Sequence, residues 1–430
     1  MQAHAIRRVA VVAVATIALL GANAVSSRAA ATSTAGGPSR TPVPGSAPRW
    51  AKPNRDVGDV AGNRQVTVSV YLALRDPAGA EALVQQVSDP TSSTYGAYIS
   101  PDQFASQYEA SAADVSAVEH FLTNSGLTID SADSSSVVAS GALSSAEAAF
   151  GATVHRYAYR GRVLDAPTAT LSVPSSLAGK VSAVTGLDQS GTLTRPQHDV
   201  PGTTASGAAS APTAGHAGTT APPPAAFVNA PPCSTYFGQK VATQYPAVNG
   251  QHVPFAPCGY TPAQYQGAYG TSGLVSHGLD GRGVTVAITD AYAAPTILQD
   301  ANQYARRHGQ PTMSSHQFSQ IVPNKFRYGY DDTTNGDLCG EQGWYGEETL
   351  DVEAVHAMAP GAKILYVAGK SCDDPDLLGA LDKIVSKHRA DIITNSWGDI
   401  GEDVDADTLQ AYHSLFLKAA AEGIGVFYSS

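Results

Sequence analysis

Positive charge is scarce in this sequence, which has 26 lysine and arginine residues against 37 aspartate and glutamate residues and a formal net charge of −11. A chain with that balance lacks the basic surface that holds nucleic acids and anionic membranes, so the sequence argues against both as partners. Hydrophobic residues make up 43% of the chain and charged residues 15%, proportions that are typical of a folded protein. The 430 residues leave room for two to three domains.

The sequence also lacks a hydrophobic run long enough to cross a membrane comfortably. The candidate run, residues 9–20, follows Arg7 and Arg8 and precedes the small residues Gly21-Ala22-Asn23-Ala24. A membrane helix needs about 20 apolar residues, whereas a basic start, a short apolar core and an A-x-A-like end are the pattern of a secretory signal peptide. We therefore expect residues 1–31 to be a signal peptide and the protein to be secreted and extracellular. A retained anchor is the alternative.

Cysteine is rare, and none of it lies in a C-x-x-C pair. The zinc motif H-E-x-x-H is absent as well, so we expect no metal ligands in this chain. An exported protein meets an oxidising compartment, which favours disulfides. Several pairings are open, and the pairing that closes the shorter loops joins Cys233 to Cys258 and Cys339 to Cys372.

Two regions of alternating strands and helices flank a region of different composition. The first folded region, residues 55–190, has strand patterns at 66–72, 137–140 and 154–159 and helix patterns at 78–87, 112–125 and 177–184. A small α/β domain fits that order. Residues 191–232 are rich in Pro, Ala, Gly, Thr and Ser, with Asp199 as the one formally charged residue from 197 to 232. Such a stretch buries too little surface to fold, so it is predicted to be a disordered linker.

The second folded region, residues 233–430, repeats strand–helix units. Strands are predicted at 284–289, 318–322, 363–368, 391–395 and 424–429, and helices at 296–308, 347–358, 376–387 and 405–422. Repeated β-α-β units imply a parallel sheet covered by helices, so the fold class is α/β.

Polar residues gather where these strands end, which is where the chemistry of an open parallel sheet is found. They are Thr289-Asp290, Asn395-Ser396-Trp397-Gly398 and Ser429-Ser430. The helix predicted from 347 adds Glu347 and Asp351, whose spacing of four puts both carboxylates on one helical face. Two ionised carboxylates at that spacing repel each other, so the pair is expected to share a proton or to bind a cation. The alternative is that the acids of the first two turns, Glu348 and Glu353 included, only complement the helix dipole.

Several of these segments together resemble the sedolisin family of serine-carboxyl peptidases. The resemblance rests on five motifs in the right order. They are Val284-Thr-Val-Ala-Ile-Thr-Asp290, Gly346-Glu-Glu-Thr-Leu-Asp-Val-Glu353, Ala357-Met-Ala-Pro-Gly-Ala-Lys363, Ile393-Thr-Asn-Ser-Trp-Gly398 and Gly423-Ile-Gly-Val-Phe-Tyr-Ser-Ser430. Upstream, residues 89–104 and 173–188 are similar to the activation domain of that family, the pro-kumamolisin type.

The resemblance implies a subtilisin-like parallel sheet with flanking helices, incomplete here, after a small ferredoxin-like prodomain. It implies that Glu347 is the general base and Asp351 its acidic partner, with Asp290 as a further acid behind them and Trp397 beside the network. A histidine base is protonated well below pH 6.5, whereas a carboxylate can still accept a serine proton near pH 4, so the implied enzyme works in acid.

The nucleophilic serine and the oxyanion-stabilising aspartate of the family belong to segments that follow the one ending at Ser430, and its calcium ligands come later still. Gly270-Thr-Ser272 precedes the whole sheet and is predicted to be loop, so it does not replace the nucleophile. We therefore expect residues 1–430 to be a fragment or a natural truncation, inactive alone, with any calcium ligands beyond them.

The predicted function is a secreted serine-type endopeptidase proenzyme that hydrolyses peptide bonds in protein or peptide substrates at acidic pH. Its own prodomain would be its intramolecular inhibitor. A secreted non-catalytic protein, which uses the activation domain as a binding or inhibitory module, is the alternative. A glycoside hydrolase fits poorly, because its two acids flank the scissile bond from opposite sides about 5–9 Å apart.

Overall fold

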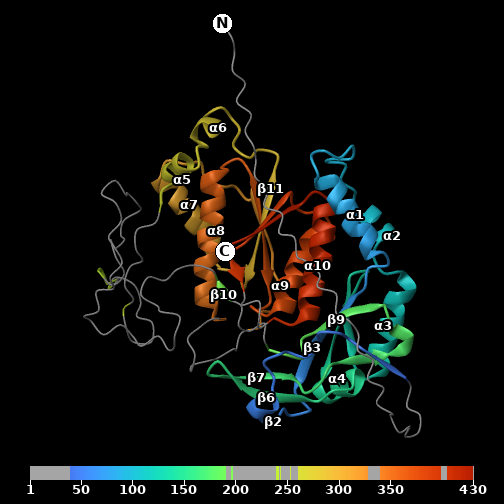
Figure 1. Ribbon diagram of the computed structural model, residues 1–430. Coiled ribbons are helices and arrows are strands. Elements are labelled where there is room, and N and C mark those ends of the chain that lie inside the picture. Colours follow the sequence, from blue (N-terminus) through green and yellow to red (C-terminus); the bar gives the residue numbers. More distant parts are fainter. Residues whose placement is uncertain are drawn as a thin grey trace. The chain divides into compact units, whose positions relative to one another are not determined.

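The computed structural model describes residues 39–189, 195–196, 239–241, 243, 252, 260–327, 339–398 and 404–429. The predicted signal peptide, most of the predicted linker and the predicted Cys233–Cys258 pair lie outside the described residues. From Arg40 on the chain forms one unit. It contains an N-terminal module, residues 40–189, and a C-terminal module, residues 260–429 (Figure 1).

The N-terminal module is built on a four-stranded antiparallel sheet. Its strands are β3 (Gln65–Leu72), β4 (Thr128–Ala132), β5 (Ser136–Ala142) and β9 (Val181–Thr185), in the order β4-β5-β3-β9. Between β3 and β4 come α1 (Pro77–Ser88), α2 (Pro101–Gln107) and α3 (Ala112–Asn124), and between β5 and β9 comes α4 (Leu143–Phe150). Two strand–helix–strand halves interleaved in this way make the ferredoxin-like arrangement. The predicted small α/β module is confirmed.

Alternation along the sequence explains why this sheet has a buried face. In β3, Val66, Val68, Val70 and Leu72 are buried, as the period-two pattern predicts. Across from them, Val118 and Leu122 of α3 fill the same core, four residues apart on one helical face.

The remaining strands of the module extend it at one side. One small sheet contains β2 (Asp56–Asp59), β6 (Val154–Tyr159) and β7 (Arg162–Pro167), and another pairs β1 (Arg40–Pro42) with β8 (Ser172–Pro174). The helix predicted at 177–184 is wrong. A short 3-10 turn, Ser175–Leu177, is followed there by strand β9, because Val181, Val184 and Thr185 are β-branched and pair with β3.

The C-terminal module is a five-stranded parallel sheet with helices on both faces. The strands lie in the order β12 (Phe318–Ile321), β13 (Lys363–Gly369), β11 (Thr285–Ala291), β14 (Ile392–Asn395) and β16 (Gly425–Tyr428). Helices α7 (Ile297–Arg307) and α8 (Glu341–Met358) cover one face, and α9 (Asp374–Val385) and α10 (Ala406–Ala421) the other (Figure 1). The predicted α/β class with a parallel sheet is confirmed.

Two boundaries in this module differ from prediction. Helix α8 begins at Glu341, six residues before the predicted start, because Gly340 supplies an extended N-cap and Trp344 is fully buried in the added turns. The Gly270-Thr-Ser272 segment is not loop throughout, since the short helix α6 (Ser272–Ser276) begins at its serine and follows α5 (Pro262–Ala268).

Helix α10 makes polar contacts with the N-terminal module. Lys418 Nζ lies 2.5 Å from Glu109 Oε1, and both side chains are buried. The backbone N–H of Val184 donates at 3.1 Å to Oδ2 of Asp407, in the first turn of α10. At its other end, the N–H of Ile99 donates to the carbonyl oxygen of Ala421 at 3.0 Å. Within the described part of the chain, no helix is both long and apolar enough to cross a membrane.

Candidate active site

The site lies where the order of the parallel strands reverses. After β11 the chain moves to β12 and β13 on one side of it, and after β13 it crosses to β14 on the other side. The carboxyl ends of β11 and β14 therefore border a crevice, which is where ligands bind in open α/β sheets. Asp290 lies at the end of β11, and Ser396 directly follows β14.

Helix α8 brings two further carboxyl groups to this crevice. Glu347 is fully buried and Asp351 is 7% exposed, and their spacing of four places them on one face of the helix. Burial of two adjacent acids is costly unless they are neutralised or paired. The predicted pair is thus in the interior of the molecule and not on a solvated helix end.

Asp351 is held by a hydrogen bond from the strand end. Ser396 Oγ donates to Asp351 Oδ1 at 2.7 Å. Burial raises the pKa of Asp351 to about 7, the hydrogen bond from Ser396 opposes that rise, and the charge of Glu347 adds to it. Below that pH the Asp351 carboxyl keeps its proton.

Asp290 completes a group of three acids. Its side chain is fully buried, and neither carboxyl oxygen has a hydrogen-bond partner among the described residues. Burial raises the pKa of Asp290 well above its usual value, and the charges of Asp351, Glu347 and Glu348 raise it further. Burial and these neighbouring charges therefore favour the protonated form of Asp290.

Trp397 closes the base of the crevice. Its indole N–H donates to the carbonyl oxygen of Thr289 at 2.7 Å, and its ring meets Tyr428 edge-on with centroids 5.0 Å apart. Thr289 is in turn hydrogen-bonded through its hydroxyl to Asn395. The indole therefore fixes the β11 backbone next to Asp290 and keeps that end of the sheet dry.

All four residues predicted from the sequence, Glu347, Asp351, Asp290 and Trp397, come together at this crevice. Two contributors were missed. Ser396 lies within the quoted Ile393–Gly398 motif, but its hydrogen bond to Asp351 leaves no mark in the sequence. Glu348 was grouped with the dipole-complementing acids, yet it is fully buried.

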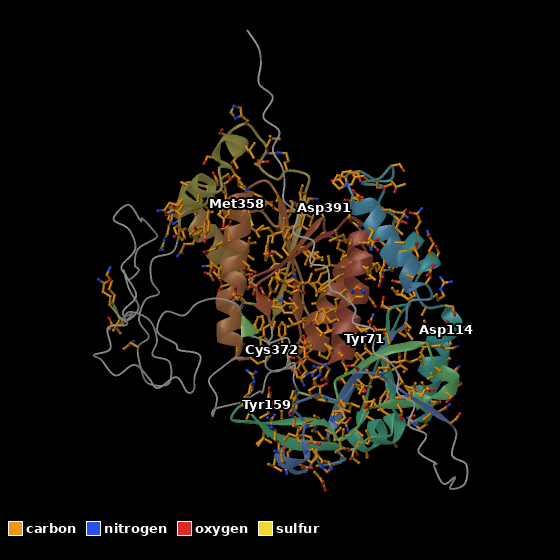
Figure 2. The ribbon with its side chains drawn as sticks, viewed as in Figure 1. Tyr71, Asp114, Tyr159, Met358, Cys372 and Asp391 are labelled. Atoms are coloured by element: carbon orange, nitrogen blue, oxygen red, sulfur yellow. A yellow bond between two sulfur atoms is a disulfide. The ribbon has the colours of Figure 1, made fainter. Side chains whose placement is uncertain are left out.

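The start of the acid-bearing helix is covalently fixed. Cys339 and Cys372 form a disulfide, as predicted, with a sequence separation of 33. Figure 2 shows Cys372 near the start of α8 and Met358 at its other end. The bridge ties the residue before Gly340 to the loop between β13 and α9.

The histidine of helix α8 lies outside the acid group. His356, five residues after Asp351, is buried and its Nε2 contacts the carbonyl oxygen of Pro311 at 2.7 Å. Residues that the structure describes include no group of three or more His, Cys, Asp or Glu side chains able to hold a metal ion. Burial lowers the pKa of His356, in keeping with a structural role.

Comparison with known proteins agrees with this geometry. The family model "Pro-kumamolisin, activation domain" matches residues 52–190. Sedolisin of Pseudomonas sp. (strain 101) is 26% identical over 372 residues, which cover 85% of this chain. Kumamolisin of Bacillus sp. (strain MN-32) is 26% identical over 397 residues, which cover 90% of this chain. The chain is thus similar to Pseudomonas sedolisin and Bacillus kumamolisin over most of its own length.

The match to these relatives is partial in length. This chain spans 53% of Pseudomonas sedolisin and 60% of Bacillus kumamolisin. Xanthomonalisin of Xanthomonas sp. (strain T-22) is 32% identical over 122 residues, 28% of this chain and 15% of that protein. A solved structure, Pseudomonas sedolisin (serine-carboxyl proteinase) complexed with two molecules of pseudo-iodotyrostatin, superposes with a TM-score of 0.32 at 26% identity. It covers 40% of this chain and 44% of that one.

Proposed function

We propose that the full-length protein is the secreted proenzyme of a serine-type endopeptidase that hydrolyses peptide bonds in acid. The observation that carries the proposal is the burial of Glu347, Asp351 and Asp290 together at the switch point of the parallel sheet. Burial of three such acids between a helix and a sheet adds nothing to stability, whereas proton-transfer chemistry needs carboxyl groups whose pKa values differ from the usual ones.

The proposed role of each acid follows from the effect of burial on its carboxyl group. Because burial raises the pKa of Asp351 to about 7, Asp351 stays neutral in acid. A neutral neighbour leaves Glu347 able to take the proton of an attacking serine hydroxyl as that oxygen attacks the peptide carbonyl. Asp290, whose pKa is raised well above its usual value, also keeps its proton in acid. The family resemblance puts the serine, the oxyanion-stabilising aspartate and any calcium ligands outside residues 1–430, and these stay predictions.

The N-terminal module is proposed to act as an intramolecular inhibitor. Strand β10 (Arg195–Pro196), which follows that module in the sequence, pairs antiparallel with β15 (Trp397–Gly398) and also contacts α8. Extended peptides bind proteins by adding a strand to an exposed edge in this way. The chain's own segment thus lies along the edge beside Ser396 that a peptide substrate would use.

The deciding experiment compares Glu347→Gln, Asp351→Asn and Glu353→Gln in the full-length protein, with a denatured protein as substrate near pH 4. Loss of a general base costs about 10²–10⁴ in rate, so the first two variants should fall by that much. Glu353 lies on another face of α8, so Glu353→Gln should stay near the wild-type rate. All three should be secreted and folded, since each replaces an acid by an amide of nearly the same shape.

The outcomes separate the two functions. Equal damage from Glu353→Gln and Glu347→Gln would overturn the assignment of the base. A full-length wild type that hydrolyses nothing at any pH would instead favour a secreted, non-catalytic protein whose N-terminal module binds or inhibits a partner. Residues 1–430 expressed alone should be inactive, and clear hydrolysis by them would contradict the expected position of the nucleophile.

A further inference from the structure

Glu348 is a buried acid that the proposed chemistry does not use. It is fully buried, although it follows Glu347 directly and points from a different face of α8. Burial raises the pKa of Glu348 to about 8, and its hydrogen bonds oppose that rise. Burial of a carboxyl group costs free energy unless its oxygens form hydrogen bonds. The hydrogen-bond partners of Glu348 therefore indicate which segments it holds in place.

Its two oxygens reach two different elements. The backbone N–H of Ala294, in the turn that follows β11, donates to Glu348 Oε2 at 2.5 Å. Gln320 Nε2, on the edge strand β12, donates to Glu348 Oε1 at 3.2 Å. The side chain therefore links the acid-bearing helix to the turn just beyond Asp290.

That turn contains a strained residue. Tyr292 has φ +64°, a left-handed conformation that is unfavourable for a non-glycine residue and persists only where surrounding contacts impose it. Its N–H donates to the carbonyl oxygen of Gly369 at 3.1 Å, and its own carbonyl oxygen accepts from the hydroxyl of Tyr366 at 2.9 Å. Tyr292 Oη donates to the carbonyl oxygen of Cys339 at 2.9 Å. Two residues further on, Ala294 is held by Glu348.

We propose that Glu348 is a positioning residue, whose carboxyl group holds the turn after β11 and thereby fixes Asp290 against Glu347 and Asp351. The inference rests on the proposed function for its effect on catalysis. The side-chain oxygens of Asp290 form no hydrogen bond with a described residue, so the position of this side chain comes from the backbone on either side of it. On one side that backbone is paired within the sheet, and on the other it passes through Tyr292 to Ala294.

An amide can replace this carboxyl group and a methyl group cannot. In Glu348→Gln the amide oxygen accepts from Ala294 N–H, and the amide NH₂ donates to the side-chain oxygen of Gln320 once that amide turns over. In Glu348→Ala the Ala294 N–H loses its acceptor. The pair of variants therefore separates the hydrogen bond from the rest of the side chain.

The test measures kinetics and amide hydrogen exchange on the full-length protein. Because a misplacement of about 1 Å can cost about 10²-fold in rate, we expect Glu348→Ala to lower kcat by about 10–100-fold with little change in KM. Glu348→Gln should restore kcat. Exchange at the Ala294 amide should accelerate in the alanine variant and match the wild type in the glutamine variant. Glu353→Ala removes a half-buried acid of α8 and controls for general destabilisation; it should lower stability and leave kcat unchanged.

Three results would overturn the inference. The first is a wild-type kcat in Glu348→Ala, the second is an Ala294 amide that exchanges equally in all variants, and the third is an equal loss of kcat in Glu353→Ala. Glu347→Gln is measured alongside. If the wild type has no activity to lose, the proposed function fails, and the exchange rate of Ala294 alone decides whether Glu348 holds the turn.

Discussion

Ser396 contributes its hydroxyl group to the acid network in a way that sets the pH range of the site. Its hydrogen bond to Asp351 Oδ1 stabilises the ionised carboxylate and so opposes the rise in pKa that burial causes. In Ser396→Ala the pKa of Asp351 should rise further, because only burial and the charge of Glu347 remain. Asp351 would then keep its proton to a higher pH, and the alkaline limb of the pH–rate profile should move up by about one unit.

The profile of kcat/KM against pH for the full-length protein checks this prediction. Ser396→Thr keeps the hydroxyl group and should give the wild-type profile. A Ser396→Ala limb that stays in place, or that moves to lower pH, would show that Asp351 is not the group that limits activity at high pH.

The residues of the site were partly readable from the sequence. Glu347 and Asp351 could be paired because a spacing of four fixes their common helical face, and Asp290 because it ends a predicted strand. Glu348 could not be interpreted, since its role depends on the turn at Ala294, which lies 54 residues away in the sequence. In the sequence Glu348 resembles an ordinary acid in the first turn of a helix, although helix α8 begins earlier, at Glu341.

At the scale of elements, the Cys339–Cys372 disulfide controls where helix α8 begins. It closes a loop with a sequence separation of 33 residues, and chain-entropy arguments assign about 3–4 kcal/mol of stability to a loop of that size. The double variant Cys339→Ala and Cys372→Ala should therefore lower the free energy of unfolding by about that amount. Urea unfolding followed by circular dichroism checks the value.

The same variant should loosen α8 unevenly. Amide exchange should accelerate in the turns around Trp344, next to the missing bridge, and less around Asp351, where the helix packs on the sheet. Uniform acceleration along the helix would mean that the bridge stabilises the whole module, and unchanged exchange would mean that packing of Trp344 suffices to form these turns.

The elements themselves were predicted where the signal was periodic. The strands of the parallel sheet are short apolar runs and the helices between them carry apolar faces, so their order and class followed from the sequence. The helix predicted at 177–184 was wrong. The apolar spacing of this segment fits a helix, but its pairing with β3 makes residues 181–185 a strand. The pairing of β10 with β15 joins residues about 200 positions apart and left no local signal.

At the scale of the whole molecule, buried acids make stability depend on pH. Burial raises the pKa of Asp351, Asp382 and Asp407 to about 7 and that of Glu348 and Glu422 to about 8. In the unfolded chain these groups lose their protons near pH 4, at the usual values of 3.8 and 4.5. The folded protein thus binds more protons than the unfolded chain between about pH 4 and pH 8, and raising the pH through that window favours unfolding.

We therefore expect the free energy of unfolding to be highest at or below about pH 5 and to fall by at least about 3 kcal/mol by pH 8, since one group displaced by two to three pKa units accounts for that much. Urea midpoints measured at constant ionic strength across this range check the prediction. Substituting amides at Asp351 and Glu348 should flatten the curve. A protein that is equally stable at pH 5 and pH 8 would contradict the burial of these acids as neutral groups.

The pairing of β10 with β15 determines how much free peptide is needed to displace β10 from the β15 edge. A segment that is part of the same chain reaches its binding edge at an effective concentration of the order of millimolar for a short flexible connection. A free peptide of equal intrinsic affinity must therefore be supplied at about millimolar concentration to occupy half of the β15 edges, however tightly it would bind to an empty one. If the chain is cut between the two modules, the concentration of β10 at the β15 edge becomes the bulk concentration of the released N-terminal piece. Dilution then frees the β15 edge.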